Sequence, residues 1–134
     1  MTCGKLILWG FLGVVVIFLI GYVLGSSGRR AAERDYSDAL LRAQVAESRA
    51  AILLARVSLY HNNFGDASRQ FEDAKNALRA TQQTVRDRRD EGAAGNVGTA
   101  LEKVAEAQIL ANKLDPTAHA RASDAIRALD AVRP

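Results

Sequence analysis

The sequence has few of the residues that cross-link a small fold or give it chemistry. It contains one cysteine, two prolines, two histidines and one tryptophan among 134 residues. A single thiol cannot form an internal disulfide. The two histidines have no thiol or carboxylate neighbours in a repeated ligand spacing, so no zinc site is predicted. The chain also lacks a phosphate-binding loop and a recognisable nucleophile motif. We therefore expect no enzyme activity, no cofactor and no metal.

The chain also lacks the alternation of apolar and polar residues that marks a half-buried strand. Hydrophobic residues make up 49% of it, and many of them are alanines, which favour closely packed helices. The net charge of +3 does not come from basic residues gathered on one face with aromatic residues between them. We therefore expect an all-α protein with no nucleic-acid partner.

One long stretch carries no charge at all, because residues 6–24 read LILWGFLGVVVIFLIGYVL. At about 1.5 Å per residue, a helix of this length crosses the hydrocarbon core of a bilayer. Trp9 and Tyr22 lie near its two ends, where amphipathic rings settle among the lipid headgroups. Residues 1–28 are thus predicted to form a tail and one transmembrane helix. A cleaved signal peptide stays an alternative, because Gly25-Ser26-Ser27 offers small residues to a peptidase.

Glycines and arginines give this segment a packing face and a direction. Four glycines fall close to one side of the predicted helix: Gly10, Gly13, Gly21 and Gly25. Small residues let membrane helices approach closely, so we expect packing against another membrane protein or a second copy of the chain. Arg29 and Arg30 follow the span at the membrane interface, and positive charge there favours a body on the cytoplasmic side. The abundance of alanine and arginine is typical of a GC-rich bacterial genome, so the expected location is a bacterial inner membrane.

Residues 29–134 are predicted to form a helical interaction domain. Steps of three and four between apolar residues predict a long amphipathic helix over 29–62. Its predicted packing seam is Tyr36, Ala39, Ala43, Ala46, Ala50, Leu53, Val57 and Tyr60. Turn-forming residues follow, and a second rhythm predicts an antiparallel helix over 66–89. The apolar positions of that helix are Ala67, Phe71, Ala74, Leu78, Thr81 and Val85.

The C-terminal part predicts a second hairpin over 97–132. Mixed charges and glycines over 86–98 predict an exposed linker before it. A third helix is expected over 97–114, with Leu101, Val104, Gln108 and Ala111 on one side. Asp115-Pro116 is typical of a helix start, so a fourth helix is expected to follow as far as Val132. Its apolar positions are Ala118, Ala122, Ala125, Ile126 and Leu129.

The first hairpin, over 29–89, resembles a tetratricopeptide repeat within residues 51–79. Four residues occupy the positions of that family's second-helix pattern: Phe64, Ala67, Phe71 and Ala74. Leu54 matches the leucine of its first helix, whereas Ser58 replaces the customary aromatic residue and Arg79 the closing proline. The resemblance implies a helical scaffold that binds a peptide or helix of a partner in a groove, without catalysis.

These patterns predict a core for the first hairpin and a function for the whole chain. The expected core residues are Leu53, Leu54, Val57, Tyr60, Phe64, Phe71 and Leu78. The expected function is that of a single-pass, membrane-anchored adaptor that binds another protein through its helical body. A small accessory subunit of a larger membrane complex is the alternative. The two differ in autonomy, because an adaptor body folds alone whereas an accessory subunit depends on its complex.

Overall fold

The fold comes from a computed structural model, which describes the backbone of residues 3–133 and the side chains of residues 31–133. The described backbone forms four helices: α1 (Cys3–Tyr60), α2 (Phe64–Asp87), α3 (Glu91–Asn112) and α4 (Ala118–Asp130). No strand occurs within residues 3–133, so the all-α prediction is confirmed. The chain divides into two compact units, residues 1–37 and 38–134. Every side chain described as buried lies in the second unit.

The predicted membrane segment lies outside the side chains that the structure describes. This applies to residues 6–24 and to eight residues expected to pack or to mark the interface: Trp9, Gly10, Gly13, Gly21, Tyr22, Gly25, Arg29 and Arg30. Among the described residues, no helix combines the length and the apolar character needed to cross a membrane. The long helix predicted over 29–62 corresponds to the C-terminal part of α1, which ends at Tyr60.

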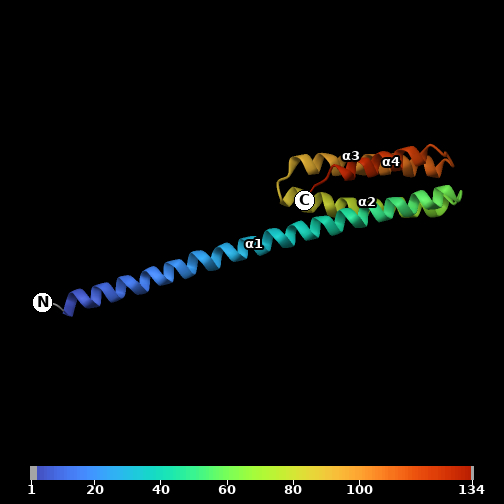
Figure 1. The fold of residues 1–134 in the computed structure, drawn as a ribbon. Helices are drawn as coiled ribbons and strands as arrows, with labels where there is room; N and C mark the ends of the chain where they lie inside the picture. The colour runs from blue at the N-terminus through green and yellow to red at the C-terminus, as the bar shows by residue number, and fades with distance from the viewer. Residues whose placement is uncertain (1–2, 134) are drawn as a thin grey trace. The chain divides into compact units, whose positions relative to one another are not determined.

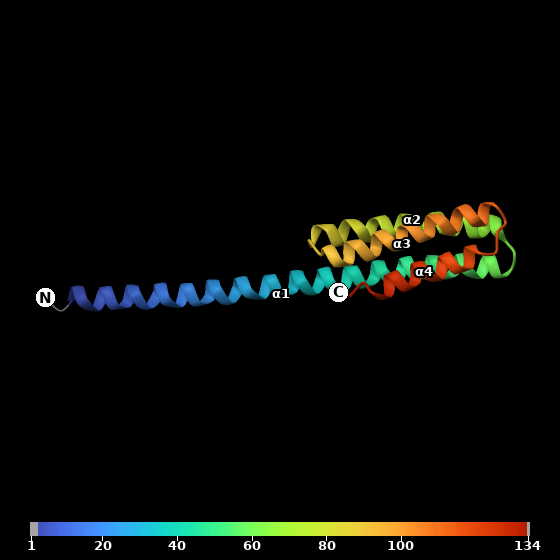
Figure 2. The same cartoon turned by 90° about the horizontal axis from the view of Figure 1, so that it is seen from above.

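A tight turn folds α2 back along the C-terminal part of α1 (Figures 1 and 2). Asn62 has a φ of 55° in this turn, a conformation that asparagine tolerates better than most residues. Asn63 then caps α2, because its side-chain oxygen accepts a 3.2 Å hydrogen bond from the backbone N–H of Asp66. Ser58 on α1 donates a 2.7 Å hydrogen bond to Gln70 on α2. The antiparallel hairpin predicted from the short connection is therefore confirmed.

The buried face of α2 is the one that the sequence predicted. All six apolar positions of the predicted rhythm are buried: Ala67, Phe71, Ala74, Leu78, Thr81 and Val85. Steps of four and three keep these side chains on one side of an α-helix. Because most of the remaining positions are charged or polar, this helix has one mainly apolar face that can be buried.

The buried face of α1 differs from the predicted seam, and that prediction was wrong. The buried side chains of α1 are Leu41, Ser48, Ile52, Ala55 and Leu59. All eight residues of the predicted seam, from Tyr36 to Tyr60, are exposed. Both sets repeat in steps of three and four, and at about 100° per residue they lie on opposite sides of the helix. The exposed set was predicted because no charged residue interrupts it, and the buried set meets the same condition.

A hydroxyl pair makes Ser48 compatible with the core. Its Oγ lies 3.3 Å from Oγ1 of Thr81, and both residues are fully buried. The Thr81 hydroxyl donates a 2.9 Å hydrogen bond to the carbonyl of Ala77, so it accepts the proton of Ser48. Shifting α1 against α2 would leave the buried hydroxyl of Ser48 without a partner, which is costly, whereas Thr81 would keep its bond to Ala77. The pair therefore favours one register between the two helices.

The predicted core of the first hairpin is only partly correct. Leu53, Leu54, Val57 and Tyr60 are 42%, 57%, 55% and 80% exposed, so their placement in the core was wrong. Phe71 and Leu78 are fully buried as predicted, and Phe64 is partly buried against the same cluster. The contribution of α1 to that cluster comes instead from its opposite side, including Ile52, Ala55 and Leu59.

The predicted linker over 86–98 is mostly helical, which is a second correction. Only three residues separate α2 from α3, and Arg89 takes a φ of 58° among them. Asp90 caps α3, because its Oδ1 accepts a 2.9 Å hydrogen bond from the backbone N–H of Ala93. Ala93 and Val97 are then buried. A glycine costs a helix about 1 kcal/mol relative to alanine, and capping and burial offset this cost here.

The second hairpin joins α3 to α4 as predicted. Asp115 organises the connection, since its Oδ1 accepts hydrogen bonds from the backbone N–H and the hydroxyl of Thr117 at 2.8 and 2.6 Å. Four predicted positions of α4 are buried: Ala118, Ala122, Ala125 and Leu129. Ile126 is partly buried against them. On α3, Val104 and Ala111 are buried, whereas Leu101 and Gln108 are only partly buried.

The register of the first hairpin can be tested by truncating one buried and one exposed side chain in the 29–134 fragment. Phe71→Ala should lower the free energy of unfolding by about 3 kcal/mol, because it leaves a cavity in the core. Leu54→Ala should change it by less than about 0.5 kcal/mol, because that side chain is already in water. Urea unfolding followed by circular dichroism measures both values. If both substitutions lowered the free energy of unfolding equally, the observed packing of α1 against α2 would be contradicted, and the seam predicted from the sequence would be favoured.

Candidate functional site

The exposed side of α1 gathers most of the large apolar side chains at the surface. Among the described residues these are Tyr36, Leu40, Leu53, Leu54, Val57 and Tyr60, together with Ile109 and Leu114 elsewhere. Within the second unit we define the exposed stripe as Ala39, Ala43, Ala46, Ala50, Leu53, Val57 and Tyr60. Exposed apolar patches on proteins are frequent sites of interaction with other molecules. Leu53, Val57 and Tyr60, which were predicted to form the core, thus lie along the same side of α1, and that side is at the surface.

A groove lies beside the stripe, between α1 and the C-terminal end of α4. Its volume is about 340 Å³, and its apolar lining includes Leu41, Val45, Leu129 and Val132. Ala46, Ala50 and Leu53 of the exposed stripe line it as well. Arg42, Arg49 and Asp130 supply its charged groups. An apolar surface with a few polar groups around it is typical of a binding site.

The groove exists because α4 is shorter than the helices around it. At the far end of α2, the Arg88 guanidinium pairs with the Asp38 carboxylate at the start of this stretch of α1. The end of α4 reaches only to the level of Arg49, with which Asp130 forms an ion pair. Along residues 38–49, α1 therefore has α2 on one side and no equivalent cover from α4. The apolar side chains of that stretch form one wall of the groove.

Arg49 gives the groove a polar group with spare hydrogen-bonding capacity. Its guanidinium pairs with Asp130 through Nη2. Its Nε is buried and has no hydrogen-bond partner among the described residues. A buried donor without an acceptor is costly. Arg49 thus brings one charged group to the apolar lining of the groove.

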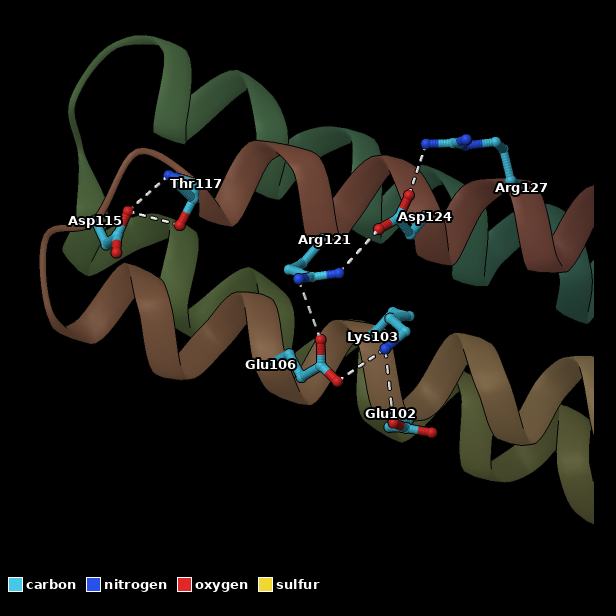
Figure 3. A network of polar contacts seen from close by, with 8 residues as sticks. All are labelled: Glu102, Lys103, Glu106, Asp115, Thr117, Arg121, Asp124 and Arg127. Atoms are coloured by element: carbon cyan, nitrogen blue, oxygen red, sulfur yellow. Dashed lines mark hydrogen bonds and ion pairs between the residues drawn. The ribbon is translucent and has the colours of Figure 1, made fainter.

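A network of ion pairs joins α3 to α4 (Figure 3). Glu106 lies between two cations, with its Oε1 2.8 Å from Lys103 Nζ and its Oε2 3.2 Å from Arg121 Nε. Arg121 also lies 3.4 Å from Asp124, which pairs at 2.6 Å with Arg127. The hydrogen bond from Lys103, with the charges of Lys103 and Arg121, holds the pKa of Glu106 below its ordinary value. The acidic and basic groups pair with one another, so the network supports the hairpin of α3 and α4.

A second polar contact joins α2 to α3. Gln108 donates hydrogen bonds to the carbonyl of Ser68 and to Oε2 of Glu72, at 3.1 and 3.2 Å. Lys75 lies 2.6 Å from the same Glu72 oxygen. The hydrogen bonds from Lys75 and Gln108 lower the pKa of Glu72. Within the residues searched, no three histidine, cysteine or acidic side chains are placed to hold a metal ion.

Sequence reasoning missed the groove, although it named several residues near it. Leu129 was expected on the apolar face of α4, and Ala46, Ala50 and Leu53 on the seam of α1. The groove, however, depends on where α4 ends relative to α1, and no sequence pattern fixes that alignment. Val45, Arg49 and Asp130 were not singled out for the same reason. Phe64, Phe71 and Leu78 do not line the groove.

The chain matches no protein-family model, no curated protein sequence and no solved structure. A function can therefore be proposed only from the residues and the geometry of the helical body.

The ion-pair network should make stability depend on pH through Glu106. The pKa of Glu106 is lowered in the folded chain, so the ionised carboxylate stabilises the fold above its ordinary pKa. This contribution is lost as the pH falls through the lowered value. Thermal unfolding should show Glu106→Gln less stable than the parent at pH 7, with the difference shrinking toward pH 3. Asp73→Asn, an exposed change on α2, should show no such trend. A constant difference for Glu106→Gln would contradict the network.

Proposed function

We propose that the protein is a single-pass, membrane-anchored adaptor whose helical body binds a segment of another protein in the groove between α1 and α4. The observation that carries this proposal is the groove itself. It combines an apolar lining with the charged groups of Arg42, Arg49 and Asp130. Its volume of about 340 Å³ lies within the range of ligand-binding pockets.

The shape and chemistry of the groove favour a protein segment as its ligand. One long wall is a helix surface, which suits an amphipathic helix or extended segment that inserts apolar side chains. Arg49 and Asp130 lie at the end of α4, where they can hydrogen-bond to the backbone or a polar side chain of that segment.

The buried core supports an adaptor over an accessory subunit. Helices α1 to α4 all contribute to a single cluster of buried apolar side chains. Burial of this kind is the main source of stability for a small domain, so the body should fold without a surrounding complex.

The anchor is proposed from the sequence of residues 6–24. A run of this length without charge suits a helix that crosses a bilayer. Gly21 and Gly25 would let this helix pack closely against another membrane helix. Arg29 and Arg30 would hold the following residues on the cytoplasmic side. Such an anchor would keep the groove close to the membrane and raise its effective concentration toward membrane-bound partners.

The groove can be tested by filling it. Asp130→Trp places a bulky ring beside Val132 and removes only a surface ion pair, so the fold should persist. Copurification of the tagged full-length protein in mild detergent should then lose the partner, with binding reduced by about tenfold or more. Asp73→Trp makes the same substitution on the exposed surface of α2 and should leave binding unchanged.

Circular dichroism would establish that both tryptophan variants are folded. If Asp130→Trp is folded and every copurifying protein is retained in full, the groove is not the docking site and the proposal fails.

A further inference from the structure

We propose that the exposed stripe of α1 pairs in parallel, and in register, with the same stripe of a second copy of this chain. The result would be a short two-stranded coiled coil on the side of α1 that faces away from its own core. The proposal does not depend on the adaptor function, although the stripe and the groove share Ala46, Ala50 and Leu53.

The spacing of the stripe fits a coiled coil. From Ala39 to Tyr60 its residues alternate steps of four and three, and all of them are exposed. Such a rhythm repeats every seven residues and keeps the seam facing a partner helix as the two wind together. The stretch extends about 33 Å at 1.5 Å per residue. A helix with one heptad face in the core and a second one in water has an unused packing surface.

The side chains of the stripe suit a second helix. Ala43, Ala46 and Ala50 allow two backbones to approach closely, while Leu53, Val57 and Tyr60 supply apolar area at one end. Leu40 and Leu54 are exposed beside the seam and would widen the buried strip. Packing that removes these larger side chains from water is the main source of stability for such a pair.

Charges beside the seam select a second copy and the parallel direction. Arg42, Arg49 and Arg56 lie on one flank, and Leu40, Glu47 and Leu54 lie on the other. In a parallel coiled coil, a residue on the first flank faces the residue five positions later in the partner. Arg42 therefore faces Glu47 of the second copy. Two-fold symmetry repeats this ion pair on the other side of the coiled coil, so the dimer would contain it twice. Arg49 faces Leu54 of the second copy, which its aliphatic stem can cover.

The antiparallel direction is disfavoured by the same residues. It would bring the two arginine flanks together, so that like charges meet along the seam. Arg42 and Glu47 also form no ion pair with any side chain described in the structure. Because they lie five residues apart, they do not face each other on one helix. Their charges are thus available to a second copy.

Disulfide trapping in the full-length protein tests the direction and the register. Cys3→Ser removes the native thiol, and Ala43→Cys or Val57→Cys then introduces one cysteine into the stripe. In mild detergent with a mild oxidant, both variants should form covalent dimers. The two positions are about 21 Å apart along the helix, so an antiparallel pair cannot join each of them to its own copy. Ala80→Cys, on the exposed surface of α2, should stay monomeric.

The outcomes of this experiment divide cleanly. Dimers at both stripe positions and not at residue 80 support the parallel pair. If the yield of covalent dimer at either stripe position does not exceed that of the Ala80→Cys control, the proposal is wrong, and the stripe faces a different protein or water. If a disulfide forms only when the Ala43→Cys and Val57→Cys variants are mixed, the proposal is also wrong, because the pair is then antiparallel.

A charge exchange tests the pairing of Arg42 with Glu47. In the Val57→Cys background, Arg42→Glu or Glu47→Arg alone should slow dimer formation by about fivefold, because attraction becomes repulsion at two symmetric sites. The double variant should recover the parent rate to within about twofold. Arg79→Glu, the same charge change on α2, should have no effect. Single variants without effect, or a double variant without recovery, would overturn the register.

Asp130→Trp separates this proposal from the adaptor function. Residue 130 lies in the groove and outside the stripe, although its partner Arg49 lies beside the stripe. This variant should still form both disulfides, whereas Asp73→Trp and the parent set the reference yield. Loss of both disulfides in the folded Asp130→Trp variant would contradict a pair that forms along the stripe without the groove.

Discussion

The packing of one side of α1 against α2 determines what the rest of the body presents to its surroundings. Ser48 and Thr81 meet inside this interface, 3.3 Å apart. Each hydroxyl is buried, and Ser48 would lose its hydrogen-bond partner if the helices slipped or rotated. With this side of α1 in the core, the opposite side with Leu53, Val57 and Tyr60 must face outward. The exposed stripe is therefore a consequence of which face was buried.

The other helices show how far sequence patterns determine such a fold. The face of α2 was predicted fully, because charged and polar residues predominate on every side except the one with Phe71 and Leu78. The hairpin of α3 and α4 was predicted from Asp115-Pro116, whose carboxylate organises the turn through Thr117. For α1 the same reasoning failed, since two apolar faces repeat with the same period and only tertiary packing distinguishes them. The start of α3 was missed because three glycines outweighed the signal of the cap at Asp90.

The binding surfaces were harder to predict than the helices. Residues of the exposed stripe were recognised as a packing seam, and the error concerned what they pack against. The groove had no signal in the sequence, because it arises from the shortness of α4 relative to α1 and α2. Arg49 and Asp130 meet across that groove only once three turns have brought their helices together. Local patterns thus describe each helix, whereas the surfaces depend on how the helix ends align.

A double-mutant cycle on Ser48 and Thr81 tests the orientation of α1 most directly. The structure predicts that Ser48→Ala and Thr81→Val are coupled, so that the effect of the two together differs from the sum of the separate effects by about 1 kcal/mol in the free energy of unfolding. Urea unfolding of the 29–134 fragment gives all the values needed. Strictly additive effects would mean that Ser48 does not meet Thr81, that the opposite face of α1 is in the core, and that the exposed stripe does not exist.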